Sequence, residues 1–565
     1  MNKEVIKIPS NIKYLSEFTD DLPDNCILDK GKIGAGGTSV AIRNSENYII
    51  AVPFLSLIEN KTAQNDNLLG VHGKVKDKDI LKYLNNDTYP KKIMVTYDSL
   101  CRLVNMIDPS EYKLLIDEYH LLFTSYSFRY EACVCVLESY TKFKSFCFMT
   151  ATVLEDDFIL TELSHIPIVE YIWDDVEEVT IHSMRCSQSV IPTVANIITQ
   201  YLDGRLSGNA YFFVNSVEFI AEMVKLLKLN DDNTRAVWST YNKFKVGLKN
   251  GRTDDVTANR KINFFTSKCF EGVDLYDKEA RIYVVSDKSK AHTLIDISTS
   301  IQQISGRVRD SLYLKDIYHI FTTTRYDIDL TYDEYKQATT KIVDVSIKVA
   351  KEYNSLSEEA RQGITELSKA NYVNRRNELF LFDENMVKID LYNYKITKCL
   401  YRLRINLTNE YQKHDFKVVE HKSLIKESFA LSNIFQDVVE ECKKGDSDYI
   451  LWACNKYDFL KSAISYLGYD KMKEYEYSPP RIKRALMAFS DKNQEDKIKV
   501  LLSTYKDFNV GTFVSNKRLK EIFTEIFQEL KITKSPKANE AERYFKVKPH
   551  VKRIAQERHH GIIIL

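Results

Sequence analysis

Gly31-Lys32-Ile33-Gly34-Ala35-Gly36-Gly37-Thr38-Ser39 is the stretch that decides how this 565-residue chain is interpreted. It has the spacing of a phosphate-binding glycine loop, G-x-x-x-x-G-K-[ST], except that Gly37 stands at the lysine position. In such a loop the backbone N–H groups surround phosphate oxygens, the hydroxyl holds Mg²⁺ and the lysine neutralises the phosphates. The candidate nucleotide-binding residues are Gly31, Lys32, Gly34, Gly36, Gly37, Thr38 and Ser39, with Thr38 also a metal ligand.

The segments on either side of this loop fit the same interpretation. Cys26–Leu28 is a short apolar run, and Val40–Ile42 is an apolar run that can begin a helix. Strand, loop and helix in this order are the context that a phosphate-binding loop needs. A glycine-rich turn alone is more often only a turn, so the rest of the chain has to support the interpretation.

Composition and charge exclude several classes of protein. The chain has 80 Lys and Arg against 79 Asp and Glu, so a nucleic-acid surface would have to be a local patch. No C-x-x-C pair occurs, and we expect Cys133 and Cys135, which alternate in an apolar run, to be buried free thiols. The N-terminus has no apolar signal segment and no run of 18 apolar residues occurs. We therefore expect a soluble cytoplasmic protein that is neither secreted nor bound to a membrane.

Lys113-Leu114-Leu115-Ile116-Asp117-Glu118-Tyr119-His120 is the strongest single pattern. An apolar strand ends in two adjacent carboxylates, which repel each other and which Mg²⁺ can neutralise. We predict that Asp117 holds the metal through water, that Glu118 polarises the attacking water, and that His120 senses the γ-phosphate. The alternative is a solvated turn at the end of a strand.

A further apolar run, Phe146–Met149, ends in Thr150-Ala151-Thr152. Hydroxyls at the end of a strand can connect a phosphate site to a neighbouring domain, so Thr150 and Thr152 are candidate coupling residues. In this order, Gly31–Ser39, Asp117–His120 and Thr150–Thr152 resemble motifs I, II and III of the DExH-box helicases of superfamily 2. Pro53 and Thr96, which end or close two other apolar runs, resemble the motifs that contact the nucleic-acid backbone in that family.

The resemblance implies a second RecA-like domain, and the pattern continues accordingly. Ala210–Ser216 is similar to motif IV, and the run that ends at Thr266 leads into Glu271–Leu275, which is similar to motif V. The resemblance makes Thr266 a candidate nucleic-acid contact. It also makes Gly272 and Asp274 candidates for coupling the nucleotide site to the bound nucleic acid.

Gln303-Ile304-Ser305-Gly306-Arg307-Val308-Arg309 matches motif VI as Q-x-x-G-R-x-R. Arginines presented from a second domain can reach the γ-phosphate and make hydrolysis depend on domain closure. The candidate catalytic residues are Asp117, Glu118, His120, Gln303, Arg307 and Arg309. The usual form has a longer spacing, and the short GRVR form is closer to viral origin-binding-type helicases, which leaves open which arginine acts as the finger.

Loss of the loop lysine leaves two hypotheses. In one, Lys32 within the loop or Lys30 just before it supplies the charge. In the other, nucleotide binds weakly or not at all, and the fold is kept for binding nucleic acid. The presence of all the other motifs favours the first.

The remainder of the chain has a helical pattern from about Asp333, and Pro479-Pro480 marks a break before a helix that Arg481–Arg484 opens. Between Val514 and Arg558 there are twelve Lys or Arg and six Glu. Ser515 can cap a helix to about Leu530, Ala538–Phe545 is a second helical pattern, and Gly561–Leu565 is strand-like. This order suits a winged-helix-like nucleic-acid module, or an ordinary solvated basic face.

The predicted fold is α/β, with two tandem RecA-like domains built on parallel sheets and a mainly α-helical C-terminal region. The predicted domains are residues 1–172, 173–328, a helical region 329–510 and a small basic module 511–565. The resemblance implies an ATP- and Mg²⁺-dependent helicase or translocase that binds single-stranded or duplex nucleic acid, DNA rather than RNA, with replication proteins as further partners. The composition and the short motif VI favour DNA replication or recombination of a phage or mobile element, in a bacterial or phage-infected cell. The alternative is an inactive pseudo-helicase that serves as a binding or scaffold protein.

Overall fold

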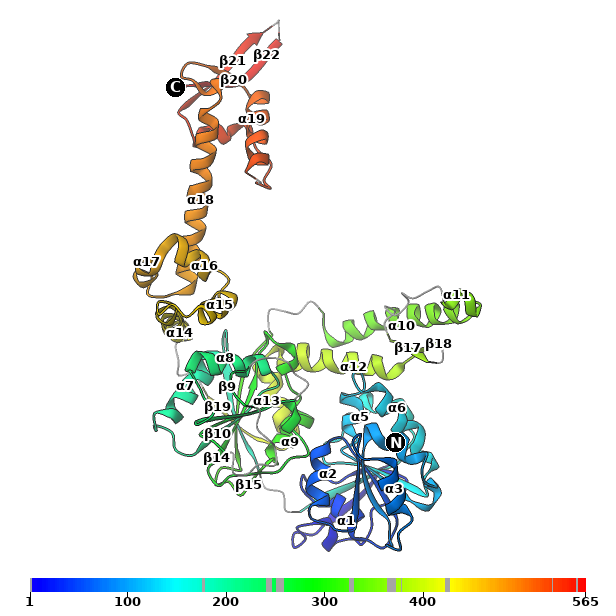
Figure 1. The fold of residues 1–565 in the computed structure, drawn as a ribbon. Coiled ribbons are helices and arrows are strands. Elements are labelled where there is room, and N and C mark those ends of the chain that lie inside the picture. Colours follow the sequence, from blue (N-terminus) through cyan, green and yellow to red (C-terminus); the bar gives the residue numbers. More distant parts are fainter. Residues whose placement is uncertain are drawn as a thin grey trace. The chain divides into compact units, whose positions relative to one another are not determined.

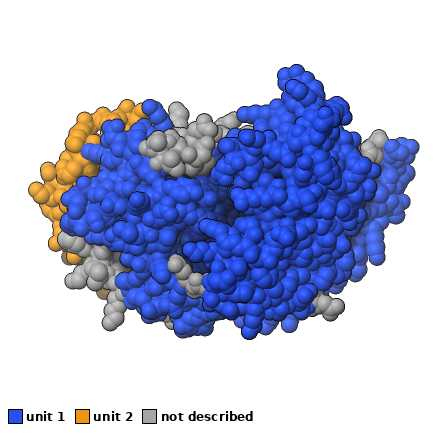
Figure 2. Space-filling model, turned by 90° about the horizontal axis from the view of Figure 1, so that it is seen from below, with its two compact units in different colours: residues 1–427 blue, residues 428–565 orange. Residues whose placement is uncertain are grey.

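The computed structural model describes residues 3–174, 178–239, 246–249, 259–324, 330–362, 372–376, 379–421, 427–530, 532–554 and 557–565. The chain divides into two compact units, residues 1–427 and residues 428–565 (Figure 2). The first unit contains two parallel sheets, and the second contains helices and a small antiparallel sheet (Figure 1). The predicted fold class, α/β with two tandem RecA-like sheets and a mainly helical C-terminal region, is confirmed.

The first lobe is an eight-stranded parallel sheet with the order β1-β8-β2-β7-β6-β3-β5-β4. Its strands are β1 (Lys3–Ile8), β2 (Cys26–Asp29), β3 (Tyr48–Val52), β4 (Leu68–Val71), β5 (Lys92–Thr96), β6 (Lys113–Asp117), β7 (Ser145–Thr150) and β8 (Ile168–Trp173). Most are nearly continuous apolar runs, because helices cover both faces of the sheet. One face packs on α1 (Gly37–Arg43) and α2 (Leu55–Thr62); the other packs on α3 (Asp77–Leu84), α4 (Tyr97–Val104), α5 (His120–Thr124) and α6 (Tyr130–Ser139).

Strand order decides what meets at the carboxyl edge of this sheet. Strand β7 lies between β2 and β6, so the glycine loop after β2, the threonines that follow β7 and the carboxylates that end β6 emerge from three adjacent strands. Ligands of open parallel sheets bind at this edge. Three stretches that are far apart in the sequence therefore form one site.

The second lobe is a seven-stranded parallel sheet with the order β11-β12-β10-β14-β16-β9-β19. Its strands are β9 (Thr180–Cys186), β10 (Asn209–Phe213), β11 (Thr234–Val237), β12 (Ile262–Phe265), β14 (Ala280–Ser286), β16 (Asp316–Thr322) and β19 (Lys417–His421). Helices α7 (Ile191–Leu202) and α8 (Val217–Leu227) cover one face. The short helix α9 (Gln302–Ser305) and the two-stranded pair β13 (Leu275–Tyr276) and β15 (Val308–Arg309) lie in the segments that resemble motifs V and VI.

Strand β19 comes from the region that was expected to be helical. It pairs with β9 and extends the second sheet by one strand at its edge. Its short run Val418-Val419 lies between charged residues, and that pattern alone does not distinguish an edge strand from part of a helix. This segment is a strand because it pairs with β9, which is distant in the sequence, and not because of its local propensity.

A helical segment connects the two cores. The elements after the second lobe are α10 (Tyr332–Asn354), α11 (Glu358–Gln362), the hairpin β17 (Val373–Arg376) and β18 (Leu379–Phe382), α12 (Glu384–Tyr394) and α13 (Arg404–Lys413) (Figure 1). Helix α12 buries Ile389 and Leu391 in the core of the first lobe. Helix α13 buries Leu407 and Tyr411 in the core of the second. We call residues 384–413 the bridge segment.

The second unit begins with α14 (Glu427–Cys442), α15 (Ser447–Lys456), α16 (Leu460–Ser462) and α17 (Gly468–Glu474), followed by α18 (Pro479–Ser503). Helix α18 begins at Pro479, two residues before the expected start at Arg481, because the first turn of a helix needs no N–H from its prolines. Helix α19 (Asn516–Glu529) starts at Ser515, whose Oγ accepts a hydrogen bond from the Arg518 N–H, again as expected. Ala538–Arg543 forms a 3₁₀ helix instead of the expected α-helix. Strands β20 (Phe513–Ser515), β21 (Val547–Ile554) and β22 (Glu557–Ile564) complete the unit.

One expectation about the cysteines was wrong. Cys135 is not a free thiol, because it forms a disulfide with Cys101 that joins α6 to α4. Cys133 is free and buried, as expected. The two bonded cysteines lie 34 positions apart on different helices, so no local spacing indicates the bond. Within the described residues, no helix combines the length and apolar character needed to cross a membrane.

Candidate functional site

The glycine loop connects β2 to α1, as the flanking sequence predicts. Gly31, Gly34 and Gly36 have φ angles of 62°, 72° and 82°, in the left-handed region that glycine adopts without strain. A Cβ on Gly31 would lie 2.0 Å from the carbonyl oxygen of Tyr171, so a larger residue cannot replace it without moving β8. The loop is therefore tightly fitted to the sheet edge.

Thr38 and Asp117 form the first part of the site. The Thr38 hydroxyl donates to Oδ2 of Asp117 at 2.8 Å, while Oδ1 of Asp117 is buried without a hydrogen-bond partner. Burial raises the pKa of Asp117, and the nearby Lys30 opposes that shift. A buried carboxylate oxygen without a partner, next to a hydroxyl, fits a Mg²⁺ ion that keeps several water or phosphate ligands. The described part of the chain contains no group of three or more His, Cys, Asp or Glu side chains that could hold a metal ion.

Glu118 is the most connected residue of the site. Its Oε1 accepts from the Lys30 ammonium at 2.9 Å, and its Oε2 accepts from Thr150 at 3.0 Å and from Gln303 at 3.1 Å. His120 Nδ1 lies 3.5 Å from Oε2. Burial alone would raise the pKa of Glu118, but Lys30 and His120 lower it to about 2. The carboxylate is therefore held ionised and oriented from several sides.

Lys30, not Lys32, brings its ammonium into this site. The Lys30 side chain is buried, and its Nζ lies 3.9 Å from Oδ1 of Asp117 in addition to its bond with Glu118. The Lys32 Nζ instead lies over the ring of Trp173, 4.9 Å from the ring centre. Lys32, which was a candidate for the nucleotide site, therefore has its ammonium at Trp173 in this structure.

The second lobe contributes Gln303, Arg307 and Arg309. The Gln303 amide also donates to Thr152 at 3.3 Å, and its Oε1 accepts from Arg307 at 3.0 Å. Arg307 is buried, which lowers its pKa, and it also donates to the Gln303 and Val273 carbonyl oxygens. Its guanidinium therefore holds the polypeptide around Gln303 in place.

Arg309 lies against the glycine loop of the other lobe. A Cβ on Gly34 would be 2.9 Å from a terminal nitrogen of Arg309, which shows how closely the guanidinium approaches the loop. Asp274 accepts from Nε of Arg309 at 3.1 Å, and the Arg309 side chain is about one-third exposed. Gly306 brings the same segment close to the loop, because a Cβ there would lie 2.5 Å from Ile33. The segment that resembles motif VI thus contacts the segment that resembles motif I.

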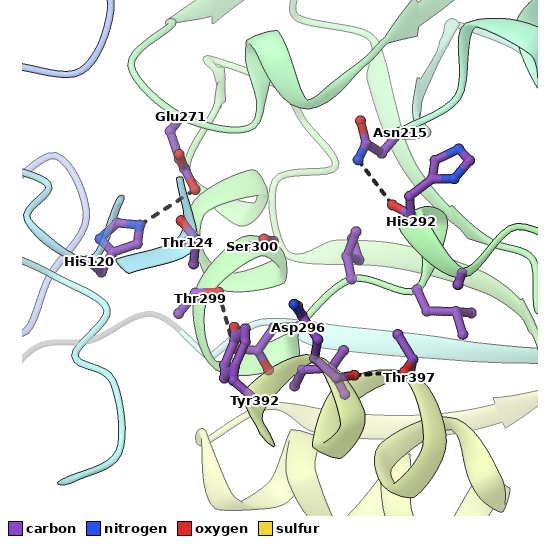
Figure 3. Close-up of a pocket in the computed structure, with 15 residues that line it drawn as sticks. His120, Thr124, Asn215, Glu271, His292, Asp296, Thr299, Ser300, Tyr392 and Thr397 are labelled. Carbon is purple, nitrogen blue, oxygen red and sulfur yellow. Dashed lines mark hydrogen bonds and ion pairs between the residues drawn. The ribbon is translucent and has the colours of Figure 1, made fainter. Parts of the chain in front are cut away.

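His120 lies on the side of the site that faces the second lobe. Its Nδ1 is 2.8 Å from the Thr150 hydroxyl, and its Nε2 is 3.5 Å from Glu271. His120 and Glu271 line a cavity of about 500 Å³ that also receives Asp296 of the second lobe and Tyr392 of α12 (Figure 3). His120 therefore links the segments that resemble motifs II, III and V.

The coupling candidates take part in contacts around this cluster. Thr150 and Thr152 are buried, and their hydroxyls lie 3.2 Å apart in a chain that connects Glu118 with Gln303. Gly272, with φ of 69°, lies against Leu57 of α2 in the first lobe, and a Cβ there would be 3.1 Å from it. Asp274 is the partner of Arg309.

Pro53, Thr96 and Thr266 lie outside this cluster. The Pro53 carbonyl accepts from Arg129 at 3.1 Å. The Thr96 hydroxyl, buried at the start of α4, lies 3.2 Å from the Ser99 hydroxyl, and the buried Thr266 hydroxyl donates to the Val237 carbonyl at 3.2 Å. Both hydroxyls are therefore used inside the protein.

The hairpin β21–β22 of the second unit carries an exposed basic surface. Lys548 and Lys552 lie on one face of β21, and Lys552 also lies 5.9 Å from the Phe513 ring. On the other face, Arg553 stands directly opposite Arg558 in the register, although like charges at such positions repel. Within the described residues none of these four side chains has an ion-pair partner. We call these four residues the basic hairpin.

Three residues of the site were not singled out from the sequence. Met149 fills the space beside Gly37, Trp173 receives Lys32, and Glu271 approaches His120. Met149 and Glu271 are each adjacent to a motif residue, Thr150 and Gly272, and this adjacency was the available signal. Nothing in the sequence around Trp173 indicates its role.

Comparisons with known proteins find similarity to solved structures only. Neither a family model nor a curated protein matches the chain. Among solved structures, the chain is similar to a variant of Saccharomyces cerevisiae Dbp5 bound to a variant of Gle1 and to IP6, with 14% identity, a TM-score of 0.38, and coverage of 59% of this chain and 92% of that one. It is also similar to S. cerevisiae Dbp5 bound to RNA and ADP BeF3, with 12% identity, a TM-score of 0.37, and coverage of 55% and 83%. A third is the Escherichia coli DEAH/RHA helicase HrpB, with 12% identity, a TM-score of 0.35, and coverage of 55% of this chain and 42% of that one. Likeness at this level says nothing of activity.

Proposed function

We propose that this chain is a nucleic-acid-dependent ATPase of the superfamily 2 DExH helicase type, with ATP and Mg²⁺ as cofactors. The observation that carries the proposal is the environment of Glu118. Three side chains bind the Glu118 carboxylate. Two of them, Lys30 and Thr150, belong to the first lobe, and the third is Gln303 of the second lobe, 185 positions after Glu118 in the sequence. A carboxylate that binds donors from both lobes is fully oriented only when the two lobes are together, as an ATPase that depends on domain closure requires.

The roles of the first-lobe residues follow from their atoms. Thr38 and Asp117, whose Oδ1 has no hydrogen-bond partner, would hold Mg²⁺, which would supply positive charge to neutralise the phosphates. Glu118, ionised and oriented, would position the attacking water and accept its proton. Gly34, Gly36 and Gly37 would line the phosphates with backbone N–H groups, whereas the Gly31 and Ser39 N–H groups donate to Asp29 and to the Gly36 carbonyl.

We assign the role of arginine finger to Arg309. Its guanidinium approaches Gly34 from the other lobe and remains partly exposed, so it can turn to a phosphate oxygen. Arg307 is fully engaged in hydrogen bonds that fix Gln303, and it acts as a positioning residue. His120, Thr150, Thr152, Gly272 and Asp274 would pass the state of the nucleotide site to the second lobe.

The nucleic acid would be bound across both lobes of the first unit, and the basic hairpin of the second unit is a separate candidate surface for it. Pro53, Thr96 and Thr266 stay proposed contacts in the lobes, and nucleic acid would have to displace the hydrogen bonds that the Pro53 carbonyl and the two hydroxyls make inside the protein. The facing Arg553 and Arg558 would be stabilised by a phosphate between them. DNA of a phage or mobile element is the proposed substrate, in replication or recombination, and unwinding and translocation without unwinding are both compatible with this site.

A specific observation favours a second candidate, a pseudo-helicase that binds nucleic acid without hydrolysing ATP. Position 37 has no cation, and Met149 occupies the space beside it. If Lys30 did not serve the phosphates, the triphosphate would meet two carboxylates with too little positive charge.

Hydrolysis assays separate the two candidates. ATP hydrolysis is measured with no nucleic acid, with single-stranded DNA and with single-stranded RNA, for the wild type, Glu118→Gln and the matched control Glu131→Gln. Glu131 is an exposed carboxylate on α6 of the same lobe. Stimulated hydrolysis that is lost only in Glu118→Gln supports the ATPase. Nucleic-acid binding without any hydrolysis supports the pseudo-helicase and contradicts the ATPase.

A further inference from the structure

The space beside position 37, where the usual lysine is missing, is filled by neighbouring side chains. A Cβ on Gly37 would lie 2.3 Å from Sδ and 2.9 Å from Cε of Met149, and 3.6 Å from Leu15. Met149 is fully buried at the end of β7. A lysine at position 37 would require the end of the flexible Met149 side chain to move, so Gly37 and Met149 fit each other in this structure.

Lys30 reaches the same site from the end of β2. Its backbone is fixed on both sides, because its N–H donates to the Thr150 carbonyl at 2.8 Å and its carbonyl accepts from the Trp173 indole at 2.7 Å. The Lys30 ammonium lies 2.9 Å from Oε1 of Glu118.

Within the described residues, the Lys30 ammonium has N–H donors that no protein acceptor binds. An ammonium carries three N–H donors, and within the described residues Lys30 uses one of them, for Glu118. It lies 3.9 Å from Oδ1 of Asp117, the atom that would bind the metal. The two remaining donors are therefore available to an anionic oxygen beside these carboxylates.

Other cations near the loop are placed less well. Lys32 lies over Trp173, and Arg309, the assigned finger, comes from the other lobe. Within the described residues, no hydrogen bond or ion pair joins Lys61 of α2 to Asp117 or Glu118, whereas Lys30 contacts both. Lys30 is the cation that combines burial, charge and contact with both carboxylates.

We propose that Lys30 is the phosphate-binding lysine of this site, relocated from position 37 to the residue before the loop, and that Gly37 and Met149 are the matched packing that accompanies the relocation. This inference rests on the proposed ATPase function.

The first test compares nucleotide affinity across lysine variants. Binding of ADP and of a non-hydrolysable ATP analogue with Mg²⁺ is measured by calorimetry for the wild type, Lys30→Met, Lys32→Met, Lys61→Met and the exposed control Lys142→Met. Lys30→Met should weaken binding of the ATP analogue by about 10- to 100-fold, the size of a hydrogen bond to a charged group. The loss for ADP should be smaller, because the γ-phosphate adds charge. A loss in Lys32→Met or Lys61→Met in place of Lys30→Met overturns the proposal.

Removing a buried lysine also leaves Glu118 without its closest partner, so a second comparison guards against a folding defect. Glu118→Gln removes the carboxylate charge, and Lys30→Met is then added to that variant. The double variant should bind the ATP analogue about 10- to 100-fold more weakly than Glu118→Gln alone, at unchanged Tm. Equal affinities of the two variants overturn the proposal.

The second test returns a lysine to position 37. Lys30→Met with Gly37→Lys and Met149→Ala places a lysine in the usual position and clears the space that Met149 occupies. Recovery of affinity and hydrolysis supports relocation, and the matched control is Lys30→Met with Met149→Ala alone. If wild type hydrolyses ATP and Lys30→Met does so equally well, only this inference fails. If wild type neither binds nor hydrolyses ATP, the proposed function fails with it.

Discussion

Gln303 of the second lobe donates its side-chain amide to Oε2 of Glu118 in the first lobe at 3.1 Å. Arg307 donates to the other end of the same amide at 3.0 Å, so the NH₂ group must point to Glu118. The two lobes are thus joined at the carboxylate on which the proposed chemistry depends.

Gln303→Glu should weaken this connection by placing a second carboxylate against Glu118. Like charges in a buried site repel, so we expect kcat for ATP hydrolysis to fall by about tenfold or more. Steady-state hydrolysis with saturating nucleic acid gives kcat and KM. The matched control is Gln302→Glu, which adds the same charge one residue earlier at a partly exposed position. Equal effects of the two variants would show that net charge alone matters.

Much of this site follows from sequence pattern, and the reasons for the exceptions are physical. Apolar runs predicted the strands, and because parallel strands release their ends at one edge, Asp117, Thr150 and the loop had to meet. The choice between Lys30 and Lys32 depends on the direction in which each side chain leaves the backbone, which no pattern records. Met149 became part of the site through packing against Gly37, a contact between distant positions. The disulfide of Cys101 and Cys135 has the same origin.

The two arginines of the short motif should behave differently. Arg309→Lys is expected to lower kcat by about 1000-fold or more with a smaller change in KM, because a lysine cannot reproduce the planar guanidinium at a transferring phosphoryl group. Arg307→Lys should instead lower Tm, because it loses hydrogen bonds to the Gln303 and Val273 carbonyls. Hydrolysis kinetics and thermal melts of both variants test the assignment. The opposite pattern would make Arg307 the finger.

His319 should make stability depend on pH. It is fully buried on β16, hydrogen-bonded to Ser286 and to Tyr411 of the bridge segment, and burial lowers its pKa from 6.5 to about 3. The folded state therefore favours neutral histidine, so the stabilisation is complete above pH 6.5 and is lost as the pH falls from 6.5 towards 3. The loss should be about 1.4 kcal/mol for each pH unit in that range.

Urea unfolding at about pH 7.5, 6.0 and 5.0 measures this effect. His319→Gln cannot take up the proton, so its free energy of unfolding should fall less steeply below pH 6.5 than that of the wild type. His165→Gln is the control, since His165 is exposed. Parallel pH profiles for wild type and His319→Gln would contradict the role given to burial.

The basic hairpin should contribute to the salt dependence of nucleic-acid binding. Replacing Lys548, Lys552, Arg553 and Arg558 by alanine should weaken binding, and it should flatten the slope of log K against log salt by about 0.7 for each lost phosphate contact on a single strand. Fluorescence anisotropy with a labelled oligonucleotide between low and moderate salt gives the slope. The control replaces four exposed basic residues elsewhere in the second unit, Lys461, Arg484, Lys497 and Lys499. If both sets flatten the slope equally, the hairpin has no special role.

The bridge segment also sets the smallest piece of this chain that we expect to fold on its own. Ile389 and Leu391 complete the core of the first lobe, and Leu407 and Tyr411 complete the core of the second. Strand β19 then adds the last strand of the second sheet. A first lobe cut after residue 174 would expose apolar surface that α12 normally covers, and a two-lobe fragment cut near residue 330 would lack part of both cores. We therefore expect residues 1–421 to be the smallest fragment with both lobes that folds on its own.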